Sequence, residues 1–182
     1  MSWKIKSSLR MNSASIKLIA QSLLLLAIQV LLFRNIALFD VAFCFVYISI
    51  ILLLPIETDR IAVLLIAFIV GLTVDIFYNS FGIHASSAVL IGFIRFHWTN
   101  IITPQGGYDA NSSPNLNNMG ALWFATYILP LIFVHHFTLF FTESGGFSFF
   151  WFTLLKVFLS TIFTFLAIII IQLLFANRKR GL

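Results

Sequence analysis

The chain has 182 residues, of which 60% are hydrophobic and only 9% are charged, and its mean hydropathy is +1.03. A soluble domain carries about 25% charged residues, and a chain of this length could not hide so much apolar surface in one core surrounded by water. The composition therefore excludes an ordinary soluble protein and predicts a single integral membrane domain.

The net charge of +5 comes from 11 Lys and Arg against 6 Asp and Glu. The basic residues gather toward the two ends of the chain, without the aromatic-interleaved basic patch that marks nucleic-acid binding. We therefore expect contact with the lipid bilayer and none with nucleic acid. Cys44 is the single cysteine, so no internal disulfide can form. Its place in an apolar run indicates a packing residue.

A transmembrane helix needs roughly 20 apolar residues. Taken in chain order, the apolar runs predict about six such helices and an all-α integral membrane protein: 18–33, 41–56, 61–78, 81–98, 119–141 and 149–176. The fourth run is the least apolar. The stretch 99–120, rich in Asn, Pro and Gly, predicts a polar loop. Residues 1–17 form a basic N-terminal segment, 18–176 the transmembrane domain, and 177–182 a basic tail.

Lys and Arg predict the orientation, because cytoplasmic segments of membrane proteins are enriched in them. With the N-terminus in the cytoplasm, one cation (Arg34) lies on the opposite side, and Lys156 lies within the sixth span. The cytoplasmic side then holds the other nine: Lys4, Lys6, Arg10, Lys17, Arg60, Arg95, Arg178, Lys179 and Arg180. This asymmetry requires an even number of crossings. Six crossings place both termini in the cytoplasm.

The most informative stretch is 71–85, because it holds an acid inside an apolar run. Ala67, Gly71 and Asp75 recur every four residues and so share one helix face. Small residues on such a face let a second helix approach closely, which suggests a packing or assembly surface. Two other interpretations of Asp75 stay open. It lies about 21 Å into its span and so could reach the outer headgroups, or it could handle a proton or a ligand.

If Asp75 is buried, its carboxylate needs a partner, because a helix C-terminus disfavours negative charge. Arg34 and His84 are the candidates at the same end of the predicted bundle, and Arg34 would form an ion pair. His84, at the start of its helix, is more typical of a local hydrogen-bonding residue than of a ligand. His135 and His136 are adjacent and point about 100° apart, so they cannot chelate one metal ion as an i, i+4 pair would. Packing or interfacial polarity is the better interpretation.

Three remaining residues have structural interpretations. Lys156 is expected to extend its ammonium outward along its stem, and Pro55 and Pro130 to kink or end their helices. The sequence contains no nucleotide-binding loop, zinc-protease motif or serine-hydrolase motif, and no close pair of intramembrane acids. We therefore expect a protein that is not an enzyme and that uses no metal or cofactor.

The segments LLLPIETDR and GLTVDIFYNSFGIHASSAVLIGFIR resemble the rod shape-determining MreD family, and ITPQGGYD resembles its members with a long fourth-to-fifth connection. The specific part covers 52–109. The resemblance implies a non-enzymatic scaffold of the cell-elongation machinery in the bacterial inner membrane, which helps position peptidoglycan synthesis. The implied partner is MreC, and through it MreB, RodA and its penicillin-binding transpeptidase. The family's acid-and-glycine motif falls on Gly71, Asp75, Gly82 and His84.

A second function class fits the same length and span number. Vitamin-capturing subunits of energy-coupling-factor transporters have about six spans, and MreD resembles them in fold. A binding subunit of this kind should present convergent polar groups in a pocket. The sequence offers few candidates for such a pocket, chiefly Asp75, Asn79 and His84. Co-purification distinguishes the two classes, because a scaffold brings MreC and a transporter subunit brings an ATPase pair or a vitamin.

Overall fold

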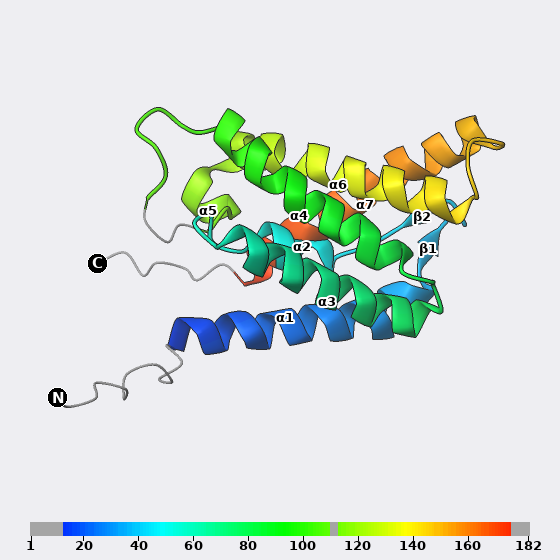
Figure 1. Ribbon diagram of the computed structural model, residues 1–182, viewed down its shortest axis with the longest axis horizontal. Coiled ribbons are helices and arrows are strands. Elements are labelled where there is room, and N and C mark those ends of the chain that lie inside the picture. Colours follow the sequence, from blue (N-terminus) through cyan, green and yellow to red (C-terminus); the bar gives the residue numbers. More distant parts are fainter. Residues whose placement is uncertain (1–12, 110–112, 176–182) are drawn as a thin grey trace.

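The computed structural model describes residues 13–109 and 113–175. Its main elements are five long helices that lie lengthwise along the molecule (Figure 1): α1 (Ser13–Leu31), α3 (Arg60–Tyr78), α4 (Ile83–Ile101), α6 (Ala121–Glu143) and α7 (Phe150–Leu174). α1 begins and α7 ends at the same end, called the terminal end below. The opposite end, called the turn end, carries the α6–α7 connection. The described residues leave out 1–12 and 176–182, which hold most of the predicted basic segments, and positions 110–112 of the polar loop.

Helix length and composition agree with the prediction of a mostly helical membrane protein. Among the described residues, four helical stretches are long and apolar enough to cross a membrane: Leu18–Asn35, Arg60–Tyr78, Ala121–Glu143 and Phe150–Leu174. α4 is as long as α3 but less apolar, as expected for the fourth run. The polar loop is shorter than predicted, because α4 continues to Ile101 and a four-residue helix, α5 (Leu116–Met119), precedes α6.

The second predicted helix is wrong. In place of one helix over 41–56, the chain forms a two-residue strand, β2 (Ala42–Phe43), and then a five-residue helix, α2 (Ile48–Leu52). β2 pairs antiparallel with β1 (Ala37–Leu38), which follows the single-turn η1 (Phe33–Asn35). Two strands of two residues each leave the chain mostly helical, which is compatible with the predicted all-α class. We call residues 41–56 the central segment. All of its residues from Cys44 to Leu52 are buried, and it leads from the turn end back toward the terminal end (Figure 1).

Burial explains why hydropathy misled the prediction. A run of apolar residues is equally suited to a helix surrounded by lipid and to an extended segment enclosed by other helices, because both environments exclude water. The central segment is enclosed by other helices. Its Tyr47, Ile48, Ile51 and Leu52 are fully buried in the same hydrophobic core as Phe124 and Ile132 of α6 and as residues of α3, α4 and α7.

The α3–α4 hairpin is defined by local capping at each turn. The side chain of Asp59 accepts hydrogen bonds from the backbone N–H groups of Ile61 and Ala62, which starts α3. α3 ends at Asn79, whose φ of 54° lies in the left-handed region. Gly82, with a φ of +83°, then begins α4. This connection brings the end of α3 against the start of α4.

Candidate functional site

Asp75 lies at the α3–α4 junction, and its carboxylate is bound inside the protein. It is 3% exposed. One carboxylate oxygen, Oδ1, accepts from the Ser80 hydroxyl at 2.6 Å and from the His84 backbone N–H at 3.0 Å, while Oδ2 accepts from the Ala85 backbone N–H at 2.8 Å. These amides belong to the first turn of α4, whose N–H groups and positive dipole end favour a negative charge. Asp75 of α3 therefore caps α4.

The predicted partners of Asp75 are thus replaced by other groups. The guanidinium of Arg34 lies over the Tyr78 ring, with Cζ 5.9 Å from the ring centroid, and the side chain is exposed. His84 does contact Asp75, but through its backbone N–H and not its imidazole. The headgroup interpretation is also replaced, because the carboxylate is buried.

Gly71 holds α3 and α4 at backbone contact. A Cβ atom built on Gly71 would lie 2.5 Å from the Ala85 Cα and 2.8 Å from the His84 carbonyl oxygen. Atoms that close cannot coexist, so any larger residue at position 71 must push the two helices apart. Ala67 is fully buried on the same face of α3. The predicted face of Ala67, Gly71 and Asp75 therefore packs against α4 within this chain.

A second polar group lies deeper in the core, where Tyr47 joins two histidines. The Tyr47 hydroxyl is 3.2 Å from Nδ1 of His84 and 2.6 Å from Nε2 of His135. A phenol donates one proton and can accept another, so one imidazole nitrogen acts as acceptor and the other as donor. The remaining His135 nitrogen, Nδ1, is buried and has no hydrogen-bond partner in the described part of the chain. The bonded series ends there.

His136, whose ring centroid lies 5.3 Å from that of His135, forms a separate series of hydrogen bonds. Its Nδ1 lies 2.8 Å from the Ile132 carbonyl oxygen and therefore carries the proton. Its Nε2 then accepts from the Thr164 hydroxyl at 3.1 Å, while Thr164 accepts from the Phe45 backbone N–H at 3.0 Å. His135 and His136 are both fully buried. They therefore pack in the protein interior and do not lie at a membrane–water interface.

The His136 series is one part of a larger pattern that supports the central segment. In a buried segment that is not a helix, each backbone polar group needs a partner from elsewhere in the protein. Gln29 of α1 donates from Nε2 to the Cys44 carbonyl oxygen at 3.1 Å and accepts from the Tyr47 N–H through Oε1 at 3.3 Å. Ser160 of α7 accepts from the Phe43 N–H at 2.9 Å. Side chains of the first and last helices thus replace the missing helical hydrogen bonds.

Arg95 supports the other end of the central segment. It is 3% exposed. Its Nη2 donates to the carbonyl oxygens of Leu54 at 2.5 Å and Pro55 at 3.1 Å, and its Nε donates to the Tyr127 hydroxyl at 2.9 Å. Tyr127 in turn donates to the Leu52 carbonyl oxygen at 2.7 Å. Tyr127 therefore binds the last carbonyl of α2, and the buried Arg95 binds two carbonyls just after it, where the negative end of a helix favours a positive charge.

Sequence reasoning missed most of these supporting residues. Gln29, Ser160 and Thr164 were absorbed into apolar runs, and Arg95 was counted only as a cytoplasmic charge. Their polarity within apolar runs was itself a signal of a buried partner, because polar side chains inside membrane helices are costly and usually bind one. The partner itself could not be named, because backbone groups of an extended segment leave no trace in side-chain spacing.

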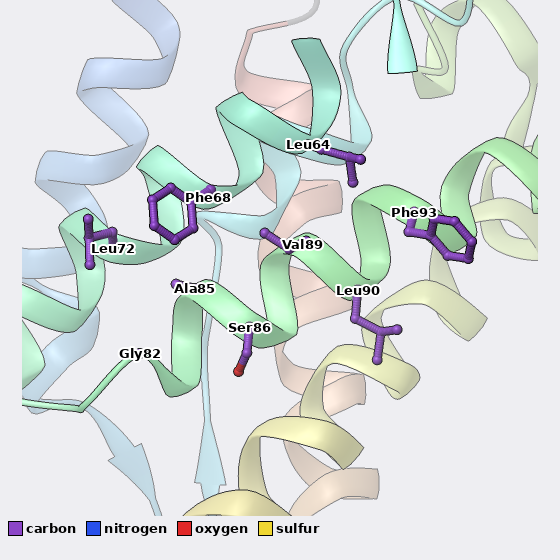
Figure 2. Close-up of a pocket in the computed structure, with 9 residues that line it drawn as sticks. All are labelled: Leu64, Phe68, Leu72, Gly82, Ala85, Ser86, Val89, Leu90 and Phe93. Carbon is purple, nitrogen blue, oxygen red and sulfur yellow. The ribbon is translucent and has the colours of Figure 1, made fainter. Parts of the chain in front are cut away.

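The outer surface of the α3–α4 hairpin carries an open groove of about 620 Å³ (Figure 2). Its walls are almost entirely carbon, from Leu64, Phe68 and Leu72 of α3 and from Ala85, Ser86, Val89, Leu90 and Phe93 of α4, with Gly82 at one end. The Ser86 hydroxyl donates to the Ile83 carbonyl oxygen within its own helix. The groove therefore offers apolar contact and no polar recognition.

The polar groups inside the bundle mostly bind one another and the backbone. Among the described residues, no group of three or more His, Cys, Asp or Glu side chains is arranged to hold a metal ion. Asn79, one of the three residues expected to line a pocket, serves as the C-cap of α3. What the arrangement does is fix the path of the central segment and the angle of the α3–α4 hairpin. No protein-family model, curated protein or solved structure matches the chain.

Proposed function

We propose that the chain is a non-enzymatic scaffold of the machinery that elongates rod-shaped bacteria, and that it holds MreC in the inner membrane and helps position peptidoglycan synthesis. The proposal starts from the resemblance of residues 52–109 to the MreD family. The observation that carries it is the engagement of Asp75 by Ser80 and by the first turn of α4. The residues behind the resemblance therefore build a rigid junction, which is what a scaffold requires.

The same observation weighs against a vitamin-binding subunit. The polar groups expected to meet a ligand, Asp75 and His84, bind partners of the chain itself. Tyr47 fills the space between His84 and His135. A ligand in this part of the interior would have to displace a fully buried tyrosine and break both of its hydrogen bonds.

A six-crossing topology belongs to the proposal. Five crossings are the long helices, and the sixth is the central segment, which returns the chain from the turn end toward the terminal end (Figure 1). Together with the Lys and Arg asymmetry, this path supports a cytoplasmic location for both termini. Reporter fusions at residue 58 and at the C-terminus should report the cytoplasm, and fusions at residue 146 the periplasm. A periplasmic C-terminus would contradict the topology.

Co-purification with MreC tests the scaffold itself. The tagged chain, extracted in mild detergent, should retain MreC through size-exclusion chromatography, and depletion in a rod-shaped host should give round or swollen cells. Recovery of an ATPase pair or a bound vitamin in place of MreC would favour the transporter class. Normal cell shape after verified depletion would contradict the scaffold.

Variants at the α3–α4 junction test whether its geometry is needed to bind MreC. Gly71→Leu forces α3 and α4 apart, whereas Asp75→Asn keeps the shape and removes the charge. If α3–α4 geometry presents the MreC surface, Gly71→Leu should reduce MreC recovery more than Asp75→Asn. Should Asp75→Asn leave the complex intact and still abolish rod shape, the structural role of Asp75 would be insufficient. Proton or ligand handling would then replace it.

A further inference from the structure

A second groove lies at the turn end between α6 and α7, and it differs from the α3–α4 groove in carrying charge. Its volume is about 550 Å³, and its walls include the rings of Phe140, Phe149 and Phe152. Two ionisable side chains of opposite sign also line it, Glu143 and Lys156. The groove therefore combines an apolar surface with one anionic and one cationic group.

Lys156 is held in the groove by aromatic rings. Its Nζ lies 5.4 Å from the ring centroid of Phe43, 5.8 Å from that of Phe140 and 5.5 Å from that of Phe152. Such contacts attract a cation to the ring faces. Within the described residues, no carboxylate lies within ion-pair distance of this ammonium, so its charge is not neutralised by the chain. The expected extension toward water is replaced by a half-buried position among rings.

The depth of Lys156 suits a lipid headgroup. It lies six residues after the start of α7 at Phe150, or about 9 Å along the helix axis. Trp151 and Phe149 are 79% and 70% exposed around it, and aromatic side chains gather where the hydrocarbon meets the headgroups. The ammonium is therefore placed near that boundary, within reach of a phospholipid phosphate on its headgroup side.

Glu143 supplies the opposite charge. It is the last residue of α6 and is exposed, and the described part of the chain gives its carboxylate no hydrogen-bond or ion-pair partner. The neighbouring Ser144 hydroxyl already donates toward the carbonyl oxygens of Phe141 and Gly146. A ligand in this groove thus meets a free cation in the wall and a free carboxylate at the end of α6.

We propose that this groove binds phosphatidylethanolamine. Lys156 binds the lipid phosphate, Glu143 binds the ethanolamine ammonium, and an acyl chain covers the exposed rings of Phe149 and Phe152. A purely anionic headgroup, such as that of phosphatidylglycerol, is attracted by Lys156 but repelled by Glu143. A free phosphate ion leaves the rings uncovered. Charge complementarity with both ends of a zwitterion therefore selects this lipid.

The test is native mass spectrometry of the full, delipidated chain titrated with phosphatidylethanolamine or phosphatidylglycerol. A single solvent-accessible ion pair contributes up to about 1 kcal/mol, or roughly a fivefold change in affinity. The wild type should therefore bind phosphatidylethanolamine three- to fivefold more tightly than phosphatidylglycerol. Soluble glycerophosphoethanolamine, which lacks acyl chains, should not compete at equal concentration, because the rings contribute to binding.

Two variants and one control separate the charges. Lys156→Gln should weaken both lipids. Glu143→Gln should weaken phosphatidylethanolamine and strengthen phosphatidylglycerol, so that the preference disappears. Because Glu143 is exposed, this variant is expected to fold even if Lys156→Gln does not. Arg34→Gln removes a cation from the same end of the molecule and should leave both affinities unchanged. Equal binding of the two lipids by the wild type, or a preference that survives Glu143→Gln, would overturn the proposal.

Discussion

Two buried charges of opposite sign lie along α4: Asp75 of α3 contacts its first turn, and Arg95 is a residue of α4 itself. At the turn end, Asp75 accepts from Ser80 and from backbone N–H groups of α4. Toward the terminal end, Arg95 donates to backbone carbonyl oxygens that follow α2. The first charge faces the positive end of a helix and the second the negative end of another. Both buried charges are thus bound by backbone groups and one hydroxyl each, and within residues 13–109 and 113–175 neither forms an ion pair with an oppositely charged side chain.

The same helix pair contains two glycines that differ in what they touch. A Cβ on Gly71 would meet backbone atoms of His84 and Ala85 at 2.5–2.8 Å, whereas a Cβ on Gly92 would meet only side-chain atoms, the nearest being the Ala67 Cβ at 3.4 Å. Side chains can adjust and backbone cannot. The turn end of the α3–α4 interface is therefore rigid, and its terminal end can adapt.

The largest expected effect is that of Gly71→Ala. Added volume in a well-packed site costs about 3 kcal/mol where the surroundings cannot relax, and here the obstacle is the backbone of α4. We expect a large fall in the apparent melting temperature, measured by size-exclusion chromatography of heated detergent extracts. Gly92→Ala is the matched control and should change stability by less than about 1 kcal/mol. Equal effects of the two variants would show that the two ends do not differ.

Arg95→Met comes second. It leaves the Leu54 carbonyl oxygen without its donor, whereas the Pro55 carbonyl oxygen still accepts from Thr58 and the Tyr127 hydroxyl still donates to Leu52. An unsatisfied buried group costs about 1–3 kcal/mol. We expect a loss of about 2–3 kcal/mol in resistance to denaturant. Tyr127→Phe removes one hydroxyl from the same network and should cost less. If Arg95→Met is as stable as the wild type, the guanidinium does not hold the end of the central segment.

Asp75→Asn should be milder, with a loss of about 2 kcal/mol. The asparagine oxygen can still accept from the Oδ1 partners, but its NH2 group then faces the Ala85 N–H, and two donors cannot bond. Ser80→Ala removes only one neutral donor and serves as the smaller reference, at about 1 kcal/mol. Thermal unfolding in one detergent compares all three proteins. A greater loss for Ser80→Ala than for Asp75→Asn would contradict the capping role of the carboxylate.

Tyr47→Phe gives the smallest expected effect. It removes one hydroxyl and with it two hydrogen bonds, to His84 and His135. At a net of about 0.5–1.5 kcal/mol for each bond, with the 3.2 Å bond to His84 the weaker, we expect a loss of about 1–2 kcal/mol. Amide hydrogen exchange provides the sharper measurement, because the central segment should exchange faster while the α3–α4 junction keeps its protection. Faster exchange at the junction as well would show that the two polar groups are coupled.

Residue spacing predicted the α3–α4 face but not what the face binds. Ala67, Gly71 and Asp75 were found because a four-residue repeat of small and acidic residues is a property of side chains. The partner of Asp75 was missed because it is mostly backbone, and every residue has the same backbone N–H. The central segment was missed for a related reason, since hydropathy reports burial and not conformation. The roles of Gln29 and Ser160 become evident only when the central segment lies beside them, because they bind its backbone groups.

The backbone support of the central segment also imposes an order on how the chain is assembled during synthesis. Ser160 and Thr164 follow the amides that they bind by 117 and 119 residues. When the ribosome delivers residues 41–56 to the membrane, α7 does not yet exist, and an unpaired amide in hydrocarbon costs several kcal/mol, on the order of a full hydrogen bond. The Phe43 and Phe45 amides can therefore reach these partners only after α7 has been made. The central segment cannot complete its final hydrogen bonds before the last long helix is synthesised.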